Sequence, residues 1–79
     1  MRLDKFLKVS RIIKRRTIAN EACDAGKVEV NGKIARASYN VKVGDVIKIT
    51  LGTKINSYKV IAINEHALKE DAAKMYEIL

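Results

Sequence analysis

The first 16 residues combine a dense positive charge with apolar residues at helical spacing, which restricts this segment to one face of a folded domain. They carry seven basic side chains and a single acid, Asp4, whereas the whole chain carries a net charge of +7. Apolar and basic residues alternate at the period of a helix, with Leu3, Phe6 and Leu7 on one side and Arg2, Lys5 and Lys8 on the other. The pattern predicts a helix with a buried side and a basic side, in which Asp4 can reach Lys8 one turn later.

Basic residues continue at every third position through Arg11 and Lys14. On one straight helix this spacing would distribute the charges around most of the axis. A break near Ser10 would allow a second segment to return the later charges to the same side. We therefore predict two short helices, the second running from about Arg15 to Ala25.

The second helix is expected to begin with Thr17 as its N-cap and to end at Gly26 in the left-handed conformation. The buried stripe of this helix is expected to contain Ile18, Ala19, Ala22 and Cys23. Its polar face is expected to contain Asn20, Glu21 and Asp24. Most of the buried stripe is small, so the two helices are expected to approach each other closely.

The middle of the chain has the features of an antiparallel sheet. Val28–Val30 and Lys33–Ile34 flank Asn31-Gly32, a pair typical of a two-residue type I′ hairpin turn. Further strands are expected at 46–51 and 58–63, and residues 68–79 have helical periodicity. The expected fold is a small α+β domain with two N-terminal helices, a small antiparallel sheet and a C-terminal helix.

No arrangement of residues typical of a catalytic or metal site is visible. His66 is the only histidine and Cys23 the only cysteine, and they lie far apart in the sequence. Gly44 and Gly52 have the positions of turn glycines. We therefore expect a binding module that is not an enzyme and has no cofactor.

A surface this basic is suited to a polyanion, because each neutralised phosphate releases counterions. A helix-turn-helix reading for DNA is disfavoured, since Glu21 and Asp24 on the second helix would meet phosphates. A lipid surface is disfavoured because the apolar side of the first helix is needed for the core of so short a chain. The backbone of a folded RNA suits the charge best, and we expect no membrane association.

Five segments, in order, resemble the S4-type RNA-binding domain. They are Arg2-Leu3-Asp4-Lys5-Phe6-Leu7, Ser10-Arg11, Arg16-Thr17-Ile18-Ala19, residues 26–32 and residues 38–47. The resemblance implies an L-shaped unit of two helices and a hairpin that grips structured RNA. It suggests one domain over residues 1–79, with the core motif at about 2–47 and further strands and a helix over 48–79.

The length and the C-terminal sequence are most similar to small bacterial ribosome-quality-control members of that family. This resemblance implies a cytoplasmic, monomeric protein that binds large ribosomal subunits obstructed by peptidyl-tRNA. It would contact large-subunit rRNA and the tRNA in the peptidyl site, and it would assist an RqcH-type factor during alanine tailing. Two alternatives stay open: a heat-shock-type factor that rescues dissociated large subunits, and an accessory RNA-binding subunit of an RNA-modification enzyme.

The residues expected to contact RNA come from the two helices, their connection and the hairpin. Arg16 is expected to be the principal phosphate contact, and its replacement by alanine is expected to leave folding nearly unchanged. The full set is Arg2, Lys5, Lys8, Ser10, Arg11, Lys14, Arg15, Arg16, Thr17, Asn20, Lys33 and Arg36.

Overall fold

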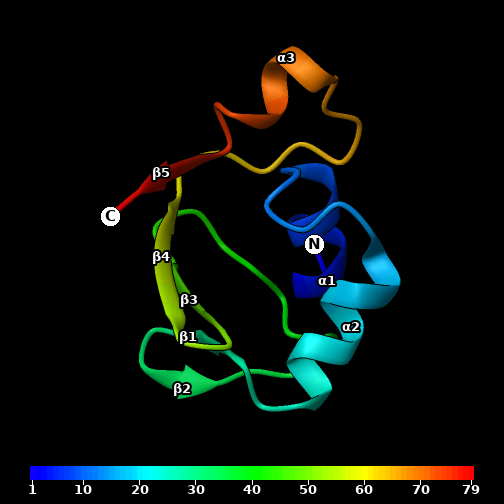
Figure 1. The fold of residues 1–79 in the computed structure, drawn as a ribbon. Helices are drawn as coiled ribbons and strands as arrows, with labels where there is room; N and C mark the ends of the chain where they lie inside the picture. Colours follow the sequence, from blue (N-terminus) through cyan, green and yellow to red (C-terminus); the bar gives the residue numbers. More distant parts are fainter.

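The computed structural model describes all 79 residues and has two N-terminal helices beside a five-stranded antiparallel sheet (Figure 1). The strand order in the sheet is β2-β1-β3-β4-β5. The α+β fold expected from the sequence is confirmed. The elements are α1 (Leu3–Val9), α2 (Arg16–Asp24), β1 (Val28–Val30), β2 (Lys33–Ile34), β3 (Val46–Leu51), β4 (Lys54–Val60), α3 (Lys69–Ala72) and β5 (Tyr76–Ile78).

The break between the two N-terminal helices lies where the charge spacing predicts it. Ser10 caps the C-terminus of α1, and Arg11 follows in the left-handed conformation with φ of 63°. The Arg11 N–H donates to the Lys8 carbonyl at 3.0 Å, and the Ile13 N–H reaches back to the Leu7 carbonyl at 3.0 Å. These bonds stop the helix and redirect the chain toward α2.

The start and the buried side of α2 differ from the sequence expectation. Arg15, and not Thr17, occupies the N-cap position, and no side chain caps this end of the helix. Ala19, Ala22 and Cys23 are buried as expected, but Ile18 is 47% exposed. Ile18 lies at the edge of the stripe, so its side chain extends past the contact with α1.

The hairpin expected at residues 28–34 is confirmed. Asn31 and Gly32 have φ of 53° and 85°, which is the double positive φ of a type I′ turn. Val30 pairs with Lys33 across the turn. Asn31 also donates to the carboxylate of buried Asp45 at 3.0 Å, which ties the turn to the start of β3.

Strand β4 begins and ends earlier than the sequence suggests. A two-residue turn at Gly52 and Thr53 pairs Leu51 with Lys54, so the strand starts at Lys54 and not at Tyr58. It ends at Val60, and residues 61–63 leave the sheet. The tight turn adds ladder pairs that the longer expected loop would have omitted.

The prediction of a helix over residues 68–79 is wrong. Helix α3 has only four residues, Lys69–Ala72, and the chain then forms β5 on the free edge of β4. Tyr76 pairs with Val60, and its ring packs edge-on against Tyr58 with 5.4 Å between the ring centres. The backbone hydrogen bonds of the β4 edge and this aromatic contact outweigh the helical pattern of the segment.

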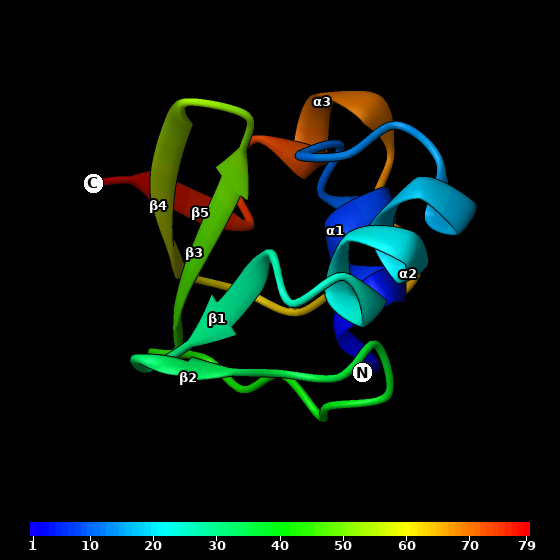
Figure 2. The same cartoon turned by 60° about the horizontal axis from the view of Figure 1, so that its bottom comes forward.

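One hydrophobic core joins the helices to the sheet. Figure 2 shows α1 and α2 next to each other on the same side of the sheet. The core holds 16 buried residues, from Leu3 in α1 to Met75 before β5. The polar side of α1 and the connection to α2 therefore remain at the surface. None of the three helices has the length and apolar character that a membrane crossing requires.

Candidate nucleic-acid interface

Two arginines from different parts of the chain meet at the carboxylate of Asp4. This side chain is buried, with 2% of the residue exposed. Arg2 donates from Nε to Oδ1 at 3.2 Å, and Arg16 lies with Nε 3.4 Å from Oδ2. Asn20 donates to Oδ2 at 3.2 Å, and the Lys5 N–H donates to Oδ1 at 2.8 Å. We call Asp4, Arg2, Arg16 and Asn20 the Asp4 cluster.

The Asp4 cluster forms because α2 packs against α1 on the side where Asp4 lies. Asp4 therefore points to Arg16 and Asn20, and not to Lys8 as the sequence suggested. Burial alone raises the pKa of Asp4, but the hydrogen bonds from Asn20, Arg16 and Arg2 outweigh it and lower the pKa below its ordinary value. The carboxylate is thus charged at neutral pH and orients both guanidinium groups.

Both arginines of the cluster keep donors available to a ligand. The Arg2 side chain is 51% exposed and the Arg16 side chain 46% exposed. Arg2 lines a hollow of about 580 Å³ together with Asn20 and Arg36. Arg16, Thr17 and Asn20 line a neighbouring hollow of about 390 Å³. These surfaces bring together the ends of both helices and the segment after β2.

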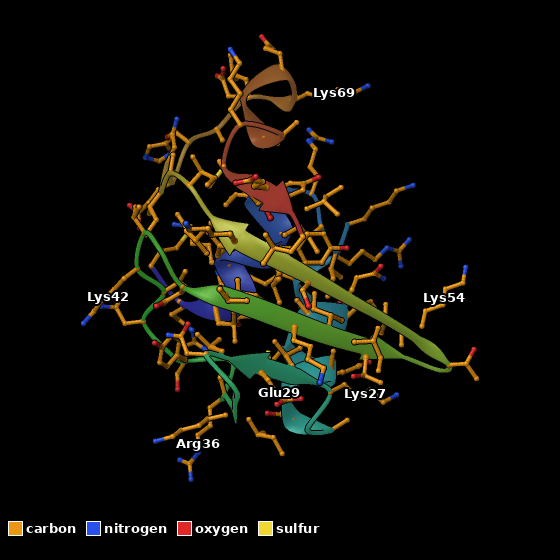
Figure 3. The ribbon with its side chains drawn as sticks, turned by 90° about the vertical axis from the view of Figure 1, so that its left-hand side faces the viewer. Lys27, Glu29, Arg36, Lys42, Lys54 and Lys69 are labelled. Carbon is orange, nitrogen blue, oxygen red and sulfur yellow. The ribbon has the colours of Figure 1, made fainter.

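Three other predicted residues gather at the opposite end of α1. Lys8, Arg11 and Lys14 line a hollow of about 570 Å³ whose walls contain no acidic side chain. Lys69, at the start of α3, completes this lining. We call these four residues the Lys69 cluster. Figure 3 shows Arg36 and Lys69 at opposite ends of the molecule. The prediction that the basic residues share one side is therefore wrong, because one group of them lies with Arg36 and another with Lys69.

The remaining predicted residues have varied surroundings. Lys5 is paired with Glu65 at 3.6 Å, and Arg15 is exposed at the start of α2. Lys33 is exposed on β2 and shares a hollow with Arg36. Ser10 is 1% exposed, and its hydroxyl donates to the Leu7 carbonyl at 3.3 Å, so we exclude it from the interface.

Sequence reasoning missed two parts of this arrangement. The sequence predicts a local pair of Asp4 with Lys8, although the position of Asp4 as the lone acid among seven bases indicates a partner shared by several of them. Lys69 lies in the predicted C-terminal helix, and nothing in its sequence neighbourhood connects it with Lys8. Only the path of the chain after β4 brings it there.

Arg11 offers a test that separates stability from binding. A residue other than glycine in the left-handed region is strained by about 1–2 kcal/mol, and Arg11 has φ of 63°. We expect Arg11→Gly to keep or raise the melting temperature while it weakens RNA binding, because the side chain is lost but the turn is relieved. Thermal unfolding and a filter-binding titration measure the two effects. A lower melting temperature with unchanged binding would show that Arg11 serves the fold alone.

The chain offers little for chemistry at this surface. Burial, with the nearby Asp4 and Asp24 carboxylates, raises the pKa of the Cys23 thiol to about 11, which keeps it protonated and unreactive at neutral pH. His66 is exposed in the loop after β4. No group of three or more histidine, cysteine, aspartate or glutamate side chains could hold a metal ion.

Comparisons with known proteins identify the family of the chain. Residues 1–47 match the S4 domain family. The chain is 53% identical over 79 residues to the RQC P-site tRNA stabilizing factor of Streptococcus pneumoniae, covering all of this chain and 90% of that protein. It is 37% identical over 65 residues to a heat shock protein 15 homolog of Haemophilus influenzae, covering 82% of this chain but 50% of that protein. The solved heat shock protein 15 of Vibrio cholerae, described as trimeric, superposes with a TM-score of 0.90 at 29% identity, over all of this chain and 81% of that one.

Proposed function

This chain belongs to the S4 domain family, and on that premise we propose that it is an RNA-binding factor of ribosome-associated quality control. It binds large ribosomal subunits that are obstructed by peptidyl-tRNA, and it contacts both the rRNA and the tRNA in the peptidyl site. Its task is to hold the tRNA in place. The full-length similarity to RQC P-site tRNA stabilizing factors supports this role.

The observation that carries the proposal is the convergence of Arg2 and Arg16 on Asp4. Guanidinium groups bind phosphates through paired, charge-assisted hydrogen bonds, and a fixed orientation reduces the entropy lost on binding. Since no side chain caps α2, its first backbone N–H groups can assist Arg16 at the same phosphate. Two half-exposed arginines fixed by one buried carboxylate form a surface that recognises the shape of an RNA backbone.

The finer parts of the proposal concern partners and setting. We propose that the protein acts as a monomer in the cytoplasm and supports an RqcH-type factor while alanines are added to the stalled chain. It performs no reaction and needs no cofactor. We also propose that residues 48–79 belong to the same domain as the matched segment, because Ile47, Ile49, Val60 and Met75 share the core with α1.

A second candidate function is that of a heat-shock-type factor that rescues dissociated large subunits. The observation in its favour is the close superposition on the Vibrio cholerae heat shock protein 15. It is disfavoured because the chain is 37% identical to the Haemophilus influenzae homolog over 65 residues, whereas it is 53% identical to the Streptococcus pneumoniae factor over 79 residues.

Co-sedimentation with purified large subunits tests the proposed function. We expect strong binding to subunits that carry peptidyl-tRNA in the peptidyl site, because both the rRNA and the tRNA then contribute contacts. Vacant subunits are the matched control and should bind more weakly. Equal binding to both would contradict the tRNA-holding role. Capture of an RNA-modification enzyme from native lysate, without ribosomal subunits, would support the accessory-subunit alternative instead.

A further inference from the structure

We propose that the Lys69 cluster is a second phosphate-binding site, which takes the sugar–phosphate backbone of an RNA strand. This inference deepens the proposed function and rests on it. It assigns part of the RNA surface to the C-terminal third of the chain, beyond the residues that match the S4 domain family.

Three segments contribute cations to this hollow and none contributes an acid. Lys8 comes from the last turn of α1, Arg11 and Lys14 from the connection to α2, and Lys69 from the start of α3. The rest of the lining is Val9 and Ala67.

None of the four cations is balanced by an ion pair within the protein. The ion pairs of the structure involve Arg2, Arg16, Lys5 and Lys48 as the basic partners. No member of the Lys69 cluster takes part in one. Like charges around one hollow repel each other, and a bound anion would relieve this repulsion. The surroundings therefore favour a ligand of high negative charge density.

The backbone on both sides of the hollow is fixed by local structure. Arg11 is fixed by the left-handed turn that ends α1, a strained conformation of the kind that collects at binding sites. Lys69 is fixed because α3 is anchored by buried Ala72 and Met75. The Ala72 N–H also donates to the Leu68 carbonyl at 3.0 Å. Neither side depends on a flexible terminus.

The Lys69 cluster is separate from the Asp4 cluster. The two hollows that contain Arg2 and Arg16 share no lining residue with the hollow that contains Lys69. The clusters lie at the two ends of α1, one beside its N-terminus and the other at its last turn. Two such sites can hold two strands at once, which suits a protein that contacts rRNA and tRNA together.

Charge reversal at Lys69, compared with the same change at Lys54, tests the inference. Both lysines are exposed, and Figure 3 shows Lys54 at the tip of the β3–β4 hairpin, away from α3. We expect Lys69→Glu to weaken binding to deproteinised large-subunit rRNA by roughly tenfold, and Lys54→Glu by less than about twofold. Lys69→Ala should lower the slope of log affinity against log salt by about 0.7–0.9. Thermal unfolding should give the same melting temperature for all three variants.

A double-mutant cycle adds a readout that general charge effects do not produce. If one phosphate contacts the whole cluster, the losses of binding free energy caused by Lys14→Ala and Lys69→Ala should be non-additive in the double variant. The losses caused by Arg16→Ala and Lys69→Ala should be additive, because these residues lie in different clusters. Equal weakening by Lys69→Glu and Lys54→Glu would overturn the second site. The same proteins tested on obstructed large subunits report on the proposed function. If the wild-type protein failed to bind obstructed subunits but still bound deproteinised rRNA, the proposed function would be refuted and the second site would not.

Discussion

Asp4→Asn should weaken RNA binding by about tenfold, although it removes an acid and raises the net charge above +7. Coulomb attraction alone predicts the opposite direction, since a more positive protein should bind a polyanion more tightly. The expected loss follows because Arg2 and Arg16 are no longer held by a carboxylate. Ordering each long side chain on binding costs about 0.5–1.5 kcal/mol, so two of them account for about a tenfold loss.

A matched control for this prediction is Asp24→Asn. Asp24 is exposed on α2, lines the hollow of Arg2 and makes no ion pair. Its replacement removes the same charge and should leave affinity unchanged or slightly raised. Filter binding at one salt concentration measures both variants. If Asp4→Asn also raised the affinity, the positioning role of Asp4 would be refuted.

Asp4 also contributes to stability, with a defined dependence on pH. Its pKa is lowered in the folded state, so its contribution is present above the ordinary pKa and is lost as the pH falls through the lowered one, below about pH 4. Asp4→Ala should lower the free energy of unfolding by about 2–3 kcal/mol at neutral pH, because charge-assisted hydrogen bonds are lost. This corresponds to roughly 10–20 °C in melting temperature. A wild-type melting temperature for Asp4→Ala would contradict the structural role.

Arg16→Ala should reduce the affinity for obstructed large subunits by roughly 10–100-fold. A guanidinium–phosphate contact is charge-assisted and worth about 1.5–3 kcal/mol, and Arg16 lies where the uncapped N-terminus of α2 adds donors. Arg16→Lys restores the charge without the planar fork, so it should recover only part of the affinity. Lys27→Ala, an exposed position without an ion pair, is the matched control and should change little.

The structure also refines what Arg16→Ala should do to folding. The sequence predicts a phosphate contact and almost no change in stability. Arg16 is paired with Asp4, but its side chain is 46% exposed, so the pair contributes only about 0.2–1 kcal/mol. We therefore expect a small, measurable drop in melting temperature. A drop as large as that of Asp4→Ala, with binding unaffected, would assign Arg16 to the fold.

The features predicted correctly from the sequence are those that local geometry determines. The break after α1 follows from charge spacing over a few turns, and the Asn31-Gly32 turn follows from the φ values that these residues tolerate. The errors arise where distant segments decide the outcome. Residues 76–78 became a strand because β4 offered an unpaired edge, which no periodicity in that segment reveals.

For the candidate interface, too, the sequence indicated local features but not the contacts between distant segments. The sequence predicted that the basic residues share one side of the two helices, but the structure divides them between the two ends of α1, because their grouping depends on tertiary packing. Asp4 joined Arg16 and Asn20 because α2 folds back over α1, not because of any helical spacing. Lys69 joined Lys8 because the chain returns past α1 after β4.

The position of Met75 in the core has a consequence for synthesis of the protein. The core that covers the apolar side of α1 also contains Ile47, Ile49, Val60 and Met75, which are translated long after it. While the chain emerges, the basic N-terminal segment therefore remains without its full apolar support until residue 75 has left the ribosome. Contacts between such distant segments also slow folding. We expect the nascent chain to acquire its native RNA-binding surface only in a late step, when the β3–β4 hairpin and Met75 close over α1.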